Sequence, residues 1–207
     1  LNPIAGFPVC VGSNGNVEHQ LQTLRTQLQQ ICPCGGTPLT ECIQSICNRW
    51  RSLSLRPGQR IFVIIVTDGE PNGPASCFSS ALKQFSRDLP VNFVVRLCTD
   101  DDHIGNFYRK LDADDELSLD VVDDILNESK DVYLKNPWLC YSFVLHTVRE
   151  AGTLLKHFDW IDERQLLPYE ASLCARLLLS GSAFVGDAES FLKIAKRDIA
   201  QSPRILS

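Results

Sequence analysis

The sequence contains no methionine among its 207 residues. A complete, unprocessed translation product begins with methionine, and the first residues here are typical of the interior of a domain. We therefore expect that a segment upstream of Leu1 has been removed. No signal peptide is visible at Leu1, but one could have been lost with that segment, so its absence says little about targeting.

Long apolar runs and dense basic blocks are also missing. The longest uncharged apolar candidate, Ile61–Val66, is far shorter than the roughly 20 residues needed to span a bilayer. The net charge of -5 gives nucleic acid or an anionic membrane surface little to bind. We expect neither a membrane span nor a nucleic-acid partner, whereas the 44% hydrophobic content is ample for a globular core.

Features that mark enzymes are scarce. There is no glycine-rich phosphate loop, Gly69-Glu70 is not a nucleophile elbow, and the four histidines have no evident catalytic spacing. His146 lies among apolar residues and is interpreted as a packed side chain. The sequence therefore predicts that the chain is not an enzyme.

Cysteine is plentiful, but its pattern favours neither disulfides nor zinc. The nine cysteines are an odd number, spread through apolar segments of a chain too large to depend on disulfides. This usage predicts an intracellular, cytoplasmic and mostly reduced protein. A single residue, Pro33, separates Cys32 from Cys34, and no second close pair follows at zinc-finger spacing. We therefore interpret these cysteines as ordinary core or loop thiols.

The first half of the chain alternates between helical and strand patterns. A short strand is predicted over Phe7–Val11, and a helix begins after Asn16 with an apolar stripe that we expect to pack in the core. Thr37 is expected to cap a second helix, with Pro38 in its first position and its end near Leu55. The stripe of the first helix consists of Val17, Leu21, Leu24, Leu28 and Ile31.

Two apolar segments are predicted as parallel strands. Arg60–Val66 has apolar residues on both alternations, as in a strand in the middle of a sheet that helices cover on both faces. Ala75–Leu89 fits a helix, and Val91–Leu97 is a second strand. This order predicts an α/β fold with a doubly wound, mainly parallel, Rossmann-like sheet.

The second half shows helical periodicity and no convincing strand. We therefore predict two regions: a partial α/β domain over residues 1–111 and a mostly helical extension over residues 112–207. Trp138 is expected in the core of the extension, with an aromatic anchor for a partner as the alternative. The predicted helices are Leu119–Lys135, Trp138–His157, Tyr169–Leu179 and Asp187–Ala200.

Thr37 and Asp68 are the candidate ligands of a cation. Asp68 closely follows the predicted strand Arg60–Val66, at the sheet edge where ligands of parallel sheets bind, and Thr37 would reach the same rim. A hydroxyl and a carboxylate suit Mg²⁺, with Mn²⁺ or Ca²⁺ as substitutes. From the residues alone, a helix cap and a loop carboxylate are the favoured interpretation.

Two segments, Gly35–Leu39 and Val63–Pro71, resemble the second and third signatures of the von Willebrand factor A (vWA) family, in the same order. The resemblance implies a vWA-type sheet and a metal-ion-dependent adhesion site. It implies that Thr37 is a metal ligand and that Asp68 contacts the ion through water. Gly36, Gly69 and Glu70 would then border the surface that binds another protein, through a partner carboxylate.

The first signature of that family, Asp-x-Ser-x-Ser, does not occur in the sequence. Because that signature supplies the direct ligands, the chain alone is expected to hold Mg²⁺ weakly or not at all. The sequence therefore predicts a vWA-type protein-binding module with an incomplete adhesion site. The alternative is a metal-independent structural or scaffolding protein that interacts through its helical half; the oligomeric state is left open.

Overall fold

The chain has an α/β fold with a three-stranded parallel sheet, as described by a computed structural model. The structure describes residues 17–30, 35–52, 55–113, 116–153, 156–179, 193 and 196–197. The chain forms two compact units. The first consists of Leu1–Ile61 and Gly69–Val91, and the second of Phe62–Asp68 and Asn92–Ser207.

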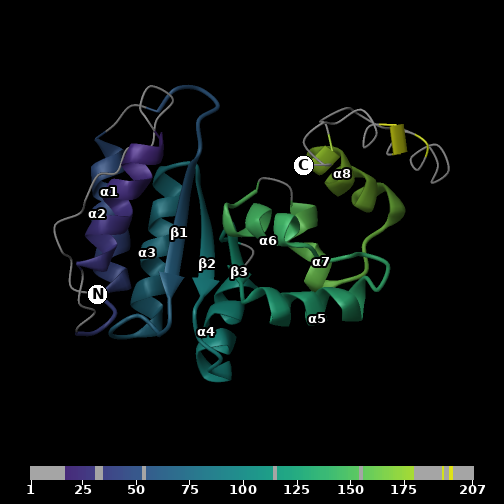
Figure 1. The fold of residues 1–207 in the computed structure, drawn as a ribbon. Coiled ribbons are helices and arrows are strands. Elements are labelled where there is room, and N and C mark those ends of the chain that lie inside the picture. Colours follow the sequence, from purple (N-terminus) through teal and green to yellow (C-terminus); the bar gives the residue numbers. More distant parts are fainter. Residues whose placement is uncertain are drawn as a thin grey trace. The chain divides into compact units, whose positions relative to one another are not determined.

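The described part of the first unit contains three helices: α1 (Val17–Gln29), α2 (Leu39–Arg51) and α3 (Ala75–Asp88). Helices α2 and α3 pack side by side (Figure 1). The buried apolar side chains of these two helices are Leu39, Ile43, Cys47, Phe78, Ala81, Leu82 and Phe85.

Helix α1 forms where expected, but its apolar stripe is not buried. Val17 is 46% exposed, and Leu21 and Leu24 are only half-buried. The expected core role of the stripe is therefore wrong for these three residues. The predicted strand Phe7–Val11 and the cap Asn16 lie outside the described residues.

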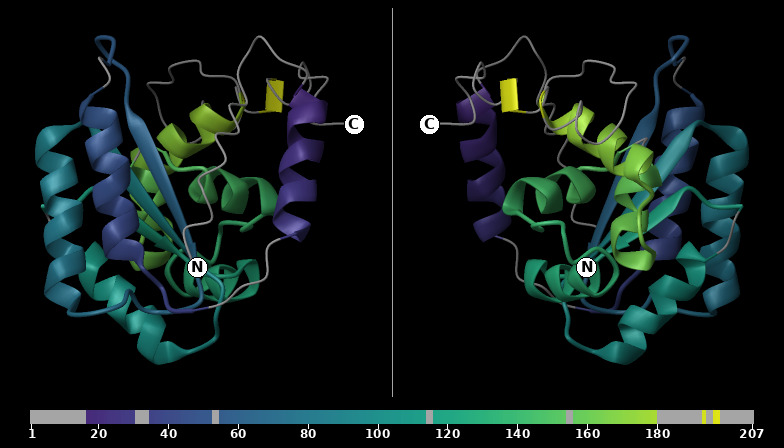
Figure 2. Two further views of the ribbon diagram at one scale, coloured as in Figure 1. Left: turned by 90° about the vertical axis from the view of Figure 1, so that its left-hand side faces the viewer. Right: turned by 90° about the vertical axis from the view of Figure 1, so that its right-hand side faces the viewer.

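The sheet consists of β1 (Ile61–Thr67), β2 (Val91–Leu97) and β3 (Leu119–Val122), in that order. Strands β2 and β3 are parallel, with Phe93 opposite Leu119 and Arg96 opposite Val122. The three arrows point the same way in Figure 1, and Figure 2 shows them from two further sides. The predicted bounds of β1 and β2 are confirmed to within a residue.

Strand β1 is an edge strand of the described sheet, and its burial alternates along the strand. Phe62, Ile64 and Val66 are 37%, 48% and 56% exposed, whereas the residues between them are buried. The expectation of a mid-sheet strand covered on both faces is therefore wrong. β2 occupies the central position, and six of its seven residues are buried.

Strand β3 corrects the expectation that no strand follows residue 112. The segment predicted as one helix, Leu119–Lys135, is this strand followed by helix α5 (Ile125–Lys135). Asp124 separates the two elements because its side chain accepts hydrogen bonds from the amides of Leu126 and Asn127, which caps α5. The predicted division into domains at residue 112 stays a prediction.

Besides the strands, the described part of the second unit contains helices. It contains α4 (Asp102–Asp112), α6 (Phe143–Glu150), the short 3-10 helix η1 (Lys156–Phe158), α7 (Trp160–Glu163) and α8 (Pro168–Leu179). The expected helix Trp138–His157 is therefore confined to α6 and η1, and Asp187–Ala200 lies almost entirely outside the described residues. One apolar cluster joins α5, α6, η1, α7 and α8: Val132, Leu145, Phe158, Ile161, Leu166 and Cys174.

Asn136 organises the turn between α5 and α6. Its fully buried side chain donates 2.8 Å hydrogen bonds to the carbonyls of Ile161 and Arg164 and accepts a 2.9 Å bond from the amide of Leu166. Trp138, which we expected in the core, is 55% exposed. The buried polar residue of this turn is thus the asparagine, and the tryptophan faces solvent.

Within the described helices, none combines the length and the apolar character needed to cross a bilayer.

We predict that Asn136→Ala lowers the free energy of unfolding by about 3 kcal/mol, because two carbonyls and one amide lose their buried partner. Denaturation in urea measures the loss. Asn106→Ala, at an exposed position of α4, is the matched control and should change stability by less than about 0.5 kcal/mol. Equal effects of the two substitutions would show that the Asn136 hydrogen bonds do not hold the turn.

Candidate functional site

The loop after β1 contains most of the residues that the sequence predicted for a site. Asp68 follows the strand directly and is exposed, Gly69 and Glu70 are half-buried, and Pro71 is buried. The amide of Cys98, which follows β2, donates a 2.9 Å hydrogen bond to the carbonyl of Thr67. The ends of two parallel strands therefore meet next to Asp68.

Thr37 is fixed against the same loop by Asn72. The Thr37 amide donates to the Asn72 Oδ1 at 2.9 Å, and the Asn72 amide donates to the Thr37 carbonyl at 2.8 Å. Thr37 does not cap α2 as expected: Pro38 is the N-cap residue, and no side chain caps this helix end. Two reciprocal hydrogen bonds thus hold the loop and the start of α2 together.

Two glycines make this close approach fit. A Cβ on Gly36 would lie 2.6 Å from the Asn72 Oδ1, which is too close for a side chain to stand there without displacing Asn72. A Cβ on Gly69 would lie 3.5 Å from the Thr37 Oγ1, so the Thr37 hydroxyl lies directly beside the Gly69 backbone. Gly36, Thr37, Gly69 and Asn72 form the clamp of this loop.

The structure therefore brings Thr37, Gly36 and Gly69 together within the first unit. Asp68 belongs to the second unit, so its pairing with Thr37 stays a prediction. Among the residues that the structure describes, no group of three or more His, Cys, Asp or Glu side chains is arranged to hold a metal ion. Asn72 was missed from the sequence, although its position in a Pro-Asn-Gly turn was a signal of tight local geometry.

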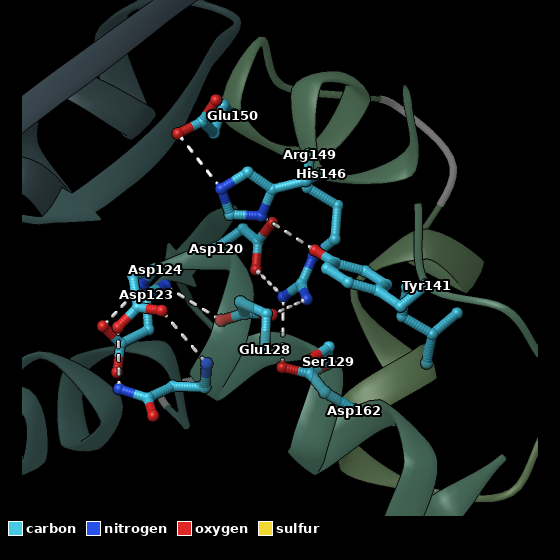
Figure 3. Close-up of polar contacts among 12 residues, drawn as sticks. Asp120, Asp123, Asp124, Glu128, Ser129, Tyr141, His146, Arg149, Glu150 and Asp162 are labelled. Atoms are coloured by element: carbon cyan, nitrogen blue, oxygen red, sulfur yellow. Dashed lines mark hydrogen bonds and ion pairs between the residues drawn. The ribbon is translucent and has the colours of Figure 1, made fainter. Parts of the chain in front are cut away.

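The second unit contains a buried ionic cluster that the sequence did not predict. Arg149 of α6 is 1% exposed, and its Nη2 lies 3.1 Å from the Asp120 Oδ1 and 3.2 Å from the Asp162 Oδ2. Its Nη1 donates to Glu128. Figure 3 shows the three carboxylates, which come from β3, α5 and α7, turned toward one guanidinium.

Burial governs the acidity of this cluster. It raises the pKa of Glu128 to about 7, and it raises the pKa values of Asp120 and Asp162 despite the opposing charge of Arg149. Burial alone would lower the pKa of Arg149, but the attraction of the three carboxylates holds it well above its usual value. Arg149 is thus a permanent cation shared by three carboxyl groups, and it can neutralise the charge of only one of them.

A cavity of about 390 Å³ opens beside this cluster. Acidic side chains outnumber basic ones along its wall. The charged lining residues are Arg109, Asp112, Asp120, Asp123, Glu128, Asp131, Lys135, Arg149, Asp162 and Glu163.

His146 is buried in a hydrogen-bonded row, as expected for a packed histidine. It is 3% exposed, with its Nδ1 3.1 Å from the Tyr141 hydroxyl and its Nε2 3.3 Å from the Glu150 Oε1. Glu150 in turn accepts a hydrogen bond from Arg96 of β2. Burial lowers the pKa of His146, so the neutral imidazole links α6 to the sheet near neutral pH.

We predict that Gly36→Ala and Asn72→Ala each destabilise the chain by about 1 kcal/mol, since each removes the Asn72 side-chain hydrogen bond to Thr37. The decisive measurement is a double-mutant cycle in urea. Because a methyl group at residue 36 acts by displacing Asn72, Gly36→Ala should cost almost nothing in the Asn72→Ala background. Fully additive losses would contradict the clamp.

Comparison with known proteins adds no relative. Neither a protein-family model, nor a curated protein, nor a solved structure matches the chain. The vWA resemblance therefore depends on the two sequence motifs alone.

Proposed function

We propose that this chain is part of a protein-binding module of vWA type, with its recognition surface on the loop after β1. The clamp formed by Gly36, Thr37, Gly69 and Asn72 is the observation that supports this proposal most directly. Two hydrogen bonds hold Thr37, in the first resembling motif, to Asn72, which directly follows the second motif. An ordered loop beside the carboxyl ends of parallel strands is the usual position of a binding site in α/β proteins.

In this proposal, Thr37 and Asp68 contribute oxygen ligands to a Mg²⁺ ion. The donor chemistry, one hydroxyl and one carboxylate, fits a hard cation. Two ligands hold Mg²⁺ weakly, so the remaining oxygens would come from outside the two motifs. A cation held this way would supply positive charge that selects a carboxylate on the partner protein.

The doubly wound sheet of a complete vWA domain belongs to the same proposal. The parallel order β1-β2-β3 and helices α3 and α4, which follow β1 and β2, are compatible with one half of such a sheet. The exposed face and open edge of β1 are compatible with further cover there.

A metal-independent scaffolding protein is the second candidate. The absence of Asp-x-Ser-x-Ser favours it, because the residues that would bind the ion directly in a vWA domain do not occur in the sequence. The second unit also exposes large apolar side chains that a partner could cover. In α5, α8 and the adjoining turns, six described apolar side chains have more than half of their surface exposed: Leu126, Tyr133, Leu134, Trp138, Leu167 and Tyr169.

We predict that the chain binds Mn²⁺ weakly and that Asp68→Ala lowers this affinity at least about tenfold, because the carboxylate that contacts the ion is lost. Electron paramagnetic resonance of free Mn²⁺ measures the binding. Glu18→Ala, which removes an exposed carboxylate of α1, is the control and should leave the affinity unchanged. Thermal unfolding of both variants should match that of the unsubstituted chain.

Two outcomes would count against the metal-dependent module. If Mn²⁺ does not bind, the scaffolding protein becomes the better account. If Asp68→Ala and Glu18→Ala weaken binding equally, the ion is attracted by the overall negative charge and not by the loop.

A further inference from the structure

We propose that the carboxyl groups around Arg149 form a proton-operated latch, which holds β3 and helices α4 to α7 together while it carries protons and loosens when they leave. This Arg149 latch consists of Asp112, Asp120, Glu128, Arg149, Asp159, Asp162 and Glu163. It does not depend on the proposed binding function, because none of its residues belongs to the loop after β1.

Among the side chains that the structure describes, the latch contains more carboxyl groups than cations. Asp120, Glu128 and Asp162 already share the single guanidinium of Arg149. Asp112, at the end of α4, lines the cavity beside Arg149, and Asp159 and Asp120 both line a second, smaller cavity. Each further carboxylate must therefore be protonated, hydrated or repelled.

The neighbouring cations do not remove this excess. Arg109 of α4 lies 3.7 Å from Asp123, and Arg164 is paired with Glu170. Lys135 of α5 lines the cavity but is exposed, as is Asp131 on the same helix.

Three further described groups lie around the latch. Lys156 of η1 is exposed at the wall of the smaller cavity. His146 and Tyr141 of the α6 region are hydrogen-bonded to each other, and burial keeps both uncharged by lowering the pKa of the histidine and raising that of the tyrosine.

The protons of the latch are held in the physiological range. Burial, with the repulsion of Asp120 next, raises the pKa of Asp112 to about 7 and that of Asp159 to about 8, from an ordinary value of 3.8. Between pH 3.8 and these raised pKa values, the folded chain holds protons on Asp112 and Asp159 that the unfolded chain has already released. The stability contributed by these protons is therefore complete in acid and is lost as pH rises through the folded values.

The first place to open should be the segment around α7. This helix has only four residues, and it carries Asp162 and Glu163 directly after Asp159. It packs against α5 and η1, and its Asp162 shares Arg149 with carboxyl groups from β3 and α5. Ionisation of Asp112 and Asp159 adds two negative charges beside it, so separation of this segment relieves the repulsion.

Hydrogen exchange tests the latch on the whole chain. At pH 6.5 and pH 8.5, after correction for the intrinsic exchange rates, amide protection is compared for peptides that cover residues 156–166. We expect protection to fall at the higher pH, by up to about tenfold per pH unit for each proton released on opening. Peptides of α2, in the first unit, should show no such fall and serve as the internal reference.

Matched variants identify the groups that are responsible. Asp159→Asn and Asp112→Asn each imitate a protonated carboxyl, so each should reduce the loss of protection between the two pH values at least about threefold. Asp100→Asn, an exposed carboxyl group outside the latch, should leave the loss unchanged.

Equal protection of residues 156–166 at both pH values would overturn the proposal without any variant. The proposal would also be overturned if Asp159→Asn and Asp112→Asn both lost as much amide protection between the two pH values as the unsubstituted chain. If one variant fails to fold, the other variant and the unsubstituted chain still decide the question.

Discussion

The second unit depends on one buried guanidinium. Arg149 draws carboxylates from β3, α5 and α7 to a single point, so strand and helices that are distant in sequence share one counter-ion. A buried ion pair gains little over an apolar core, but the loss of either partner leaves an uncompensated charge. This asymmetry makes the position of Arg149 a constraint on every element around it.

The loop after β1 depends on a different kind of interaction. Its order comes from neutral hydrogen bonds between Thr37 and Asn72 and from the space that Gly36 and Gly69 leave, so it does not depend on ionisation. The ordered loop and the proposed pH-dependent helical region therefore share no residues. Changes of pH near neutrality should act on the helices and leave the loop's hydrogen bonds intact.

Local patterns predicted β1, β2 and α3 because apolar periodicity and flanking turns define each element within a few residues. They failed for β3, a four-residue strand that contains Asp120, since a carboxylate in a short apolar run breaks the strand pattern. The Arg149 cluster was missed because its members are brought together only by the tertiary fold. One signal existed: Arg149 lies four residues after Leu145, on the apolar face of its helix.

The most direct test of this account is the free energy of unfolding of Arg149→Met, a substitution that keeps the bulk of the side chain and removes its charge. The account predicts a loss of about 3–5 kcal/mol near neutral pH, because three buried carboxylates lose their counter-ion. Arg109→Met, at an exposed arginine of the same cavity, is the matched control. A loss of less than about 1 kcal/mol for Arg149→Met, or a gain in stability, would contradict the claim that Arg149 holds the second unit together.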